Sequence, residues 1–226
     1  CYRLFASVPV YTCSLLAPSD LAGLDDIALP EPHNEEERWY CNRLVNEALN
    51  AVRMNDGSPV HINVPISEPL FEYDVPKLPD ERNIFMLHAT TDSICVYEMA
   101  ADFFRGKKLM FVLGQLTPEV VGNSLEAIEA LKKVAVVLQE KLADDSICPA
   151  QPIDEVLKMI GEDETYRPDH LIYIGGTIVS KRLRQFLREC KCKMSIVVNG
   201  IDEFCDTFMH TTDMIQGLPE DVIGIF

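Results

Sequence analysis

Two glycines, a serine and two basic residues form the clearest candidate ligand site in the sequence. They are Gly175, Gly176, Ser180, Lys181 and Arg182, and they follow a continuous apolar run. This order predicts a diglycine at the carboxyl end of a strand that opens directly into a helix, and open α/β sheets bind their ligands at such ends. Glycines let the backbone approach a ligand closely, and the free amides at a helix start favour an anion.

The two basic residues sharpen this prediction. Lys181 and Arg182 would lie in the first turn of the helix, where the helix dipole disfavours a cation by about 0.3–1 kcal/mol. A bound anion would offset that cost, so the segment predicts a site for a carboxylate or a phosphate. The alternative is that the glycines only make a tight turn and that the basic residues cover a solvated helix face. Spacing alone favours neither interpretation.

Other catalytic patterns are missing from the sequence. There is no Gly-x-Ser-x-Gly elbow, no Walker loop and no His-Glu-x-x-His, and the glycine pattern differs from that of dinucleotide dehydrogenases. The eight cysteines include no Cys-x-x-Cys pair and are predicted to be reduced thiols. Cys190, Cys192 and Cys205 with His210 fit no zinc spacing. We therefore expect neither a catalytic residue nor a metal ligand in this chain.

Charge and hydropathy limit the partners. The formal charge of −16 argues against binding to nucleic acid or to an anionic membrane surface. No apolar run reaches the ~18–20 residues that span a bilayer, and the N-terminus does not resemble a signal peptide, so a cytoplasmic protein is expected. One segment opposes the acidic trend, because residues 181–193 contain one acid, Glu189, and six basic residues: Lys181, Arg182, Arg184, Arg188, Lys191 and Lys193.

The elements that would position the site alternate between strands and helices. Continuous apolar runs at 109–113, 134–138, 171–174 and 194–198 predict strands that are covered on both faces. The amphipathic segments between them predict helices, whose buried stripes are Val121, Leu125 and Ile128; Ile153, Val156, Leu157 and Ile160; and Val179, Leu183 and Phe186. Residues 81–226 are therefore predicted to be an α/β domain with a doubly wound parallel sheet and helices on both faces.

Residues 1–80 have a different pattern. Asn34 and Glu37 resemble a capping box, and apolar residues then recur at helical spacing, which predicts a helix over 35–53. A strand is predicted at 60–64, a weaker one near 8–16, and an extended linker over 65–79. The strand at 60–64 would have no complete sheet to join, so we expect disorder or self-association there.

Two segments resemble a known family. Residues 59–65 (Pro-Val-His-Ile-Asn-Val-Pro) and 68–70 (Glu-Pro-Leu) resemble the end of the pyrimidine-binding domain of thiamine-diphosphate enzymes. Residues 175–187 resemble the Rossmann-like central domain of 2-succinyl-5-enolpyruvyl-6-hydroxy-3-cyclohexene-1-carboxylate synthase, and residues 206–213 are similar to the final stretch of that domain. The resemblance covers about 29–226.

The resemblance implies a function. The family, which serves menaquinone biosynthesis, joins 2-oxoglutarate, with loss of carbon dioxide, to isochorismate, using thiamine diphosphate and Mg²⁺. It implies that Lys181 and Arg182 hold the acidic groups of a small-molecule substrate, at a site shared with Gly175, Gly176 and Ser180. The rest of the pyrimidine-binding domain and the diphosphate domain are unmatched. We therefore expect a fragment that binds no cofactor, is inactive alone, and works with those domains in a homo-oligomer.

Two other classes of function stay open at this point. Related central domains hold FAD or ADP, so the chain could be a non-catalytic nucleotide- or effector-binding module of another thiamine-diphosphate enzyme, such as a relative of acetolactate synthase. It could also be a purely structural or oligomerisation domain. In that case no ligand would change its melting temperature.

Overall fold

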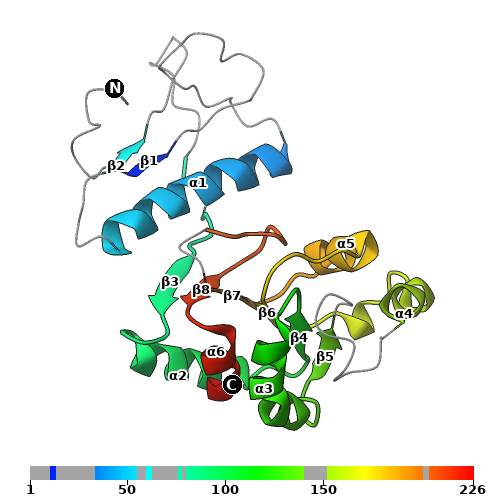
Figure 1. The fold of residues 1–226 in the computed structure, drawn as a ribbon. Helices are drawn as coiled ribbons and strands as arrows, with labels where there is room; N and C mark the ends of the chain where they lie inside the picture. Colours follow the sequence, from blue (N-terminus) through cyan, green and yellow to red (C-terminus); the bar gives the residue numbers. More distant parts are fainter. Residues whose placement is uncertain are drawn as a thin grey trace. The chain divides into compact units, whose positions relative to one another are not determined.

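The computed structural model describes residues 11–13, 34–54, 60–62, 76–77, 80–139, 152–200 and 204–226. The chain forms two compact units, Cys1–Asn83 and Ile84–Phe226. The second unit contains the diglycine segment and is an α/β domain (Figure 1).

The second unit is built on a six-stranded parallel sheet. Its strands are β3 (Phe85–His88), β4 (Leu109–Leu113), β5 (Val136–Gln139), β6 (His170–Ile174), β7 (Met194–Asn199) and β8 (Asp213–Gln216). They lie in the order β3-β8-β7-β6-β4-β5, and every pair is parallel. The three central strands β4, β6 and β7 are buried along almost their whole length, as strands covered on both faces must be.

Helices cover both faces of this sheet. They are α2 (Ser93–Phe103), α3 (Pro118–Leu131), α4 (Ile153–Ile160), α5 (Lys181–Glu189) and α6 (Pro219–Ile225), with a 3-10 turn at Glu164–Tyr166. On one face α6 packs against α2 and α3, and on the other α4 packs against α5 (Figure 1). The prediction of a doubly wound parallel sheet with helices on both faces is confirmed.

Several boundaries differ from the prediction. The second apolar run, at 134–138, begins as a turn, so that Val134 is 61% exposed and the strand starts only at Val136. Leu125, Val156 and Val179 were expected in buried stripes but are 39%, 46% and 58% exposed. Leu125 and Val156 lie within α3 and α4, where packing partners as well as spacing decide burial, whereas Val179 lies in the loop before α5.

The first unit is organised around α1 (Glu35–Met54). The predicted cap is confirmed, because the Asn34 side chain accepts a hydrogen bond from the Glu37 amide at 2.9 Å. Asn42 and Asn46, one turn apart, both donate to the Arg82 carbonyl oxygen, at 2.9 and 3.0 Å, and so hold residue 82 against the helix.

A short parallel pair completes the described part of the first unit. Strand β2 (Val60–Ile62) pairs with β1 (Tyr11–Cys13), with Tyr11 opposite Val60. Both strands fall within predicted segments. The expectation that the strand at 60–64 has no pairing partner is wrong, since the N-terminal segment supplies one.

A carboxyl group at the start of β8 makes stability depend on pH. Burial raises the pKa of Asp213 above its ordinary value, although the Thr212 hydroxyl, which donates to the carboxylate, partly opposes this. The folded pKa therefore exceeds the unfolded one, so this contribution to stability is complete below the unfolded pKa, about 3.9, and is lost as pH rises through the folded pKa.

Asp213→Asn should remove this loss of stability while keeping an oxygen that accepts from Thr212. We expect the variant to be more stable than the wild type at pH 7, with a smaller gain at pH 4, as measured by urea unfolding across that range. Glu126→Gln, a substitution on the exposed face of α3, is the matched control and should leave the pH profile unchanged. Equal effects of the two substitutions at pH 7 would contradict the prediction.

Candidate functional site

The diglycine lies where the winding of the sheet reverses. Strand β4 continues through α3 to β5 on one side, whereas its neighbour β6 continues through α5 to β7 on the other. Adjacent strands whose connections diverge leave a crevice at their carboxyl ends, and ligands of open α/β sheets bind in such crevices. The predicted site residues Gly175 and Gly176 therefore follow β6 at the topological switch point.

The loops after β4 and β6 are bonded to each other at this point. The Gly114 amide donates to the Ile174 carbonyl oxygen, and the Gly176 amide to the Gln115 carbonyl oxygen, both at 2.9 Å. Gly175 has a φ of +97°, and a Cβ there would lie 2.7 Å from the Gln115 carbonyl oxygen. The glycine at 175 is thus required by the close approach of the two loops.

The helix does not begin at the glycines. Residues 175–180 form a loop, and α5 starts at Lys181, so the prediction that the diglycine opens directly into a helix is wrong. Ser180 is the N-cap, and its hydroxyl accepts from the Leu183 amide at 2.9 Å. The prediction that Lys181 and Arg182 occupy the first turn of this helix is confirmed.

The predicted site residues separate into two groups. The Ser180 hydroxyl donates to the Asp154 carboxylate, and Arg182 Nη1 donates to the Asp154 carbonyl oxygen at 3.0 Å, so both side chains face the start of α4. Lys181 is exposed. Gly175 and Gly176 instead line a pocket whose cation is Arg184.

This pocket has a volume of about 370 Å³ and opens at the carboxyl ends of β6 and β7. The described residues that line it are Tyr173, Gly175, Gly176, Thr177, Ile178, Arg184, Val197, Val198, Asn199, Cys205 and Thr207. The half-buried Arg184 guanidinium donates from Nη2 to the Ile178 carbonyl oxygen at 2.9 Å. Apolar walls with a few polar groups and one cation suit a small anionic ligand.

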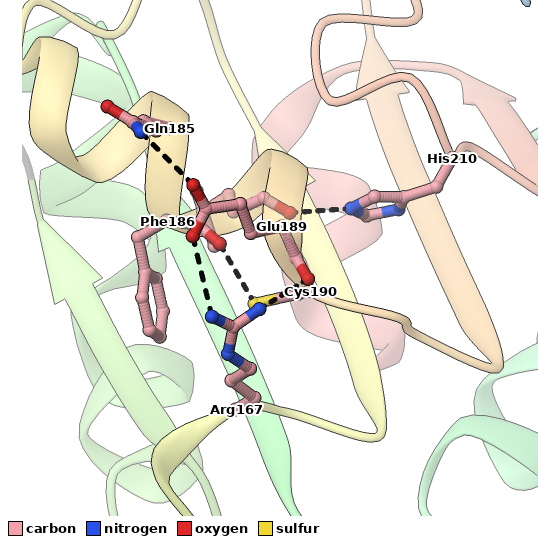
Figure 2. A network of polar contacts seen from close by, with 7 residues as sticks. Arg167, Gln185, Phe186, Glu189, Cys190 and His210 are labelled. Atoms are coloured by element: carbon pink, nitrogen blue, oxygen red, sulfur yellow. Dashed lines mark hydrogen bonds and ion pairs between the residues drawn. The ribbon is translucent and has the colours of Figure 1, made fainter. Parts of the chain in front are cut away.

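A polar network fixes the far end of α5 (Figure 2). Arg167 binds both the carbonyl oxygen and the carboxylate of Glu189, and Gln185 donates to the same carboxylate. His210 Nε2 contacts the Leu187 carbonyl oxygen at 2.7 Å. With Ser180 holding its start, α5 is anchored at both ends, so the basic side chains of its first two turns extend from a fixed backbone.

Two thiols lie at that same far end. Cys190 is buried and its Sγ donates to the Phe186 carbonyl oxygen at 3.2 Å (Figure 2). A hydrogen bond from Cys192 lowers the pKa of Cys190, against the effect of burial, and the same bond raises the pKa of Cys192.

In the described ranges no three His, Cys, Asp or Glu side chains gather to hold a metal ion.

Comparison with known proteins identifies the family. No family model matches the chain. The chain is 34% identical over 199 residues to the 2-succinyl-5-enolpyruvyl-6-hydroxy-3-cyclohexene-1-carboxylate synthase of Bacteroides thetaiotaomicron, over 84% of the chain and 35% of the relative. Proteins of the same name from Phocaeicola vulgatus and Porphyromonas gingivalis are 36% and 35% identical, over 72% and 82% of the chain and 30% and 33% of their own length. The chain belongs to this synthase family.

The resemblance predicted from the residues is thus confirmed for the synthase family, and the chain spans about a third of the length of these curated relatives. None of the helices that the structure describes is long and apolar enough to cross a membrane.

Sequence reasoning did not assign Arg184 to the site. It belongs to the run of six basic residues in 181–193, but the spacing does not show which of them lines the pocket. Helical geometry could have shown that Arg182 and Arg184 do not serve one site, because residues two apart on a helix point to nearly opposite sides. A site on the side of Arg182 therefore needs a different cation from a site on the side of Arg184.

Proposed function

We propose that this chain is the central part of a 2-succinyl-5-enolpyruvyl-6-hydroxy-3-cyclohexene-1-carboxylate synthase, a transferase of menaquinone biosynthesis. The complete enzyme would join 2-oxoglutarate, with loss of carbon dioxide, to isochorismate. The observation that carries the proposal is the 34–36% identity to synthases of that name over 72–84% of the chain. Residues 1–80 would contain an unmatched N-terminal segment (1–28), the end of the pyrimidine-binding domain and a linker, and 81–226 would be the central domain.

In this proposal the chain binds substrate and does not hold the cofactor. Thiamine diphosphate with Mg²⁺ would supply the electron sink that loss of carbon dioxide from an oxo acid requires. Mg²⁺ takes oxygen ligands in near-octahedral geometry. The described residues bring no three carboxylate, imidazole or thiol side chains together. We assign the cofactor site to the other domains.

Lys181 and Arg182 are the residues we propose for the acidic groups of the substrate. Both are exposed in the first turn of α5, which contains no acidic side chain. Cations in this position are unfavourable to the helix dipole, and an anion at the helix start relieves the cost. The contacts of Ser180 and Arg182 with Asp154 hold this turn in place, while the loop from Gly175 and Gly176 connects it to β6.

The test is steady-state kinetics on the complete synthase, with 2-oxoglutarate, isochorismate, thiamine diphosphate and Mg²⁺. A hydrogen bond to a charged group contributes about 1.5–3 kcal/mol, so Lys181→Ala and Arg182→Ala should each raise a substrate KM by about 10–100-fold. Lys191→Ala, a substitution in the same basic segment but beyond the far end of α5, is the matched control and should leave KM unchanged.

Two results would contradict the proposal. One is an unchanged KM for both substrates in the Lys181→Ala and Arg182→Ala variants. The other is release of carbon dioxide by a polypeptide of these 226 residues alone, because we assign the cofactor site to other domains.

The proposal includes a cytoplasmic homo-oligomer. It rests on the family membership and on the net charge of −16, which disfavours nucleic acid and anionic membranes as partners. Light scattering of the complete synthase would show its oligomeric state, and a monomer would count against this part.

A further inference from the structure

The pocket beside Arg184 is separate from the first turn of α5. Successive helix residues are rotated by about 100°, so positions 182 and 184 point to nearly opposite sides, whereas 184 and 188 share a side. The contacts agree, since Arg182 bonds to Asp154 of α4, while Arg188 Nε donates to the Thr207 carbonyl oxygen at 3.0 Å. Thr207 lines the pocket, and Asp154 does not.

Arg184 has unused capacity for an anion. A guanidinium has five N–H donors, and the contact with the Ile178 carbonyl oxygen uses one of them. No ion pair joins Arg184 to another residue in the part of the chain that the structure describes. A half-buried cation without a counter-charge is costly, and a carboxylate or phosphate would satisfy it with parallel hydrogen bonds.

The rest of the pocket wall fits the same ligand. Among the described residues of the wall none is acidic, although the chain carries 36 acidic residues against 20 basic ones. Thr177 and Thr207 contribute hydroxyl groups, and Ile178, Val197 and Val198 contribute apolar surface. A volume of about 370 Å³ lies at the small end of ligand cavities.

We propose that the pocket lined by Gly176, Arg184 and Thr207 is a second anion site, which binds a small molecule through one carboxylate or phosphate group on Arg184. It lies on the opposite side of α5 from Arg182, the residue assigned above to the substrate. It therefore goes beyond the proposed function and stands or falls separately from it.

Calorimetric titration of the complete synthase with inorganic phosphate and with succinate tests the site. It also shows whether the site binds a phosphate or a carboxylate group. Sodium chloride at matched ionic strength controls for screening. At least one of the two anions should bind the wild type, and Arg184→Gln should weaken that binding at least tenfold. Gln retains a donor for the Ile178 carbonyl oxygen, and melting curves show whether the variant is folded. The double substitution Lys181→Ala and Arg182→Ala is the matched control and should retain the binding.

A second measurement needs no substitution. Cys205 lines the pocket, and Cys95 lies exposed on α2 outside it. The anion that binds should slow the alkylation of Cys205 by iodoacetamide and leave that of Cys95 unchanged.

Three outcomes would overturn the proposal. The first is equal binding by the wild type and Arg184→Gln. The second is binding that depends on Lys181 and Arg182 but not on Arg184, which would assign the anion to the proposed substrate site and leave the proposed function intact. The third involves Asp202 and Glu203, which lie outside the described residues. If neither anion binds until both are changed to their amides, the counter-charge of Arg184 belongs to the chain itself.

Discussion

Gly175→Ala is expected to lower the free energy of unfolding by about 2–6 kcal/mol, because two separate costs add at this position. The backbone has a φ of +97°, which a residue with a side chain adopts only with strain of about 1–3 kcal/mol. The new Cβ would also lie 2.7 Å from the Gln115 carbonyl oxygen, and relieving such an overlap costs about 1–3 kcal/mol. Urea unfolding measures the sum.

Two other glycines separate these costs. Gly161 ends α4 with a φ of +60° but has open space where a Cβ would lie, so Gly161→Ala should show the backbone strain alone. Gly122 lies in α3 with open space and no positive φ, and Gly122→Ala should stabilise the protein by about 0.4–1 kcal/mol. If Gly175→Ala costs no more than Gly161→Ala, the contact between the β4 and β6 loops does not constrain the diglycine.

The centre of the sheet could be predicted from the sequence because burial on both faces leaves a clear signal. The runs at 109–113, 171–174 and 194–198 each coincide with β4, β6 or β7 to within one residue. The neighbouring strands β3 and β8 have four residues each, and Phe85 is 51% exposed, so neither shows a continuous apolar run. Their pairing brings the first and last strands of the unit together, and no local pattern specifies such a contact.

The position of the diglycine, though not the start of the following helix, was predicted for the same reason. The diglycine could be placed at the carboxyl end of a strand because the apolar run before it is unmistakable. The start of α5 was misplaced because Ile178, although apolar, is buried in the loop and not in the helix. Arg184 could not be selected from six basic residues, since its position in the pocket depends on Tyr173 and Thr207, which belong to β6 and to the segment after β7.

The pairing of β1 with β2 was missed for a different reason. Tyr11 and Val60 lie opposite each other although 49 positions separate them in the sequence. Strand propensity identifies both segments but says nothing of which strand each one joins. The roles of Asn42 and Asn46 in α1 could not be predicted from the sequence either. Their hydrogen bonds to the Arg82 carbonyl oxygen form only because the chain returns to the helix about 40 positions later.

Phe208→Ala should lower the free energy of unfolding by about 3–5 kcal/mol. The Phe208 ring is fully buried, and it meets the ring of Tyr173 edge-on with a centroid distance of 5.1 Å. Tyr173 in turn donates its hydroxyl hydrogen bond to the Gly176 carbonyl oxygen. Removing the Phe208 ring therefore leaves a cavity and also frees the tyrosine that holds the diglycine loop, so the pocket should loosen together with the core.

A double-mutant cycle distinguishes this coupled role from ordinary core packing. Phe208→Leu keeps most of the volume, and Tyr173→Phe removes only the hydroxyl group. If Phe208 acts through Tyr173, the two substitutions should be coupled by about 0.5–3 kcal/mol in urea unfolding, as residues in contact are. Tyr97→Ala, which removes a ring that is 59% exposed on α2, is the control for losing an aromatic side chain and should change stability by no more than about 0.5 kcal/mol. If the effects of Phe208→Leu and Tyr173→Phe on the free energy of unfolding add strictly, the Phe208 ring stabilises the core without positioning the loop. The shape of the pocket would then depend on the glycines and on Tyr173, and not on Phe208.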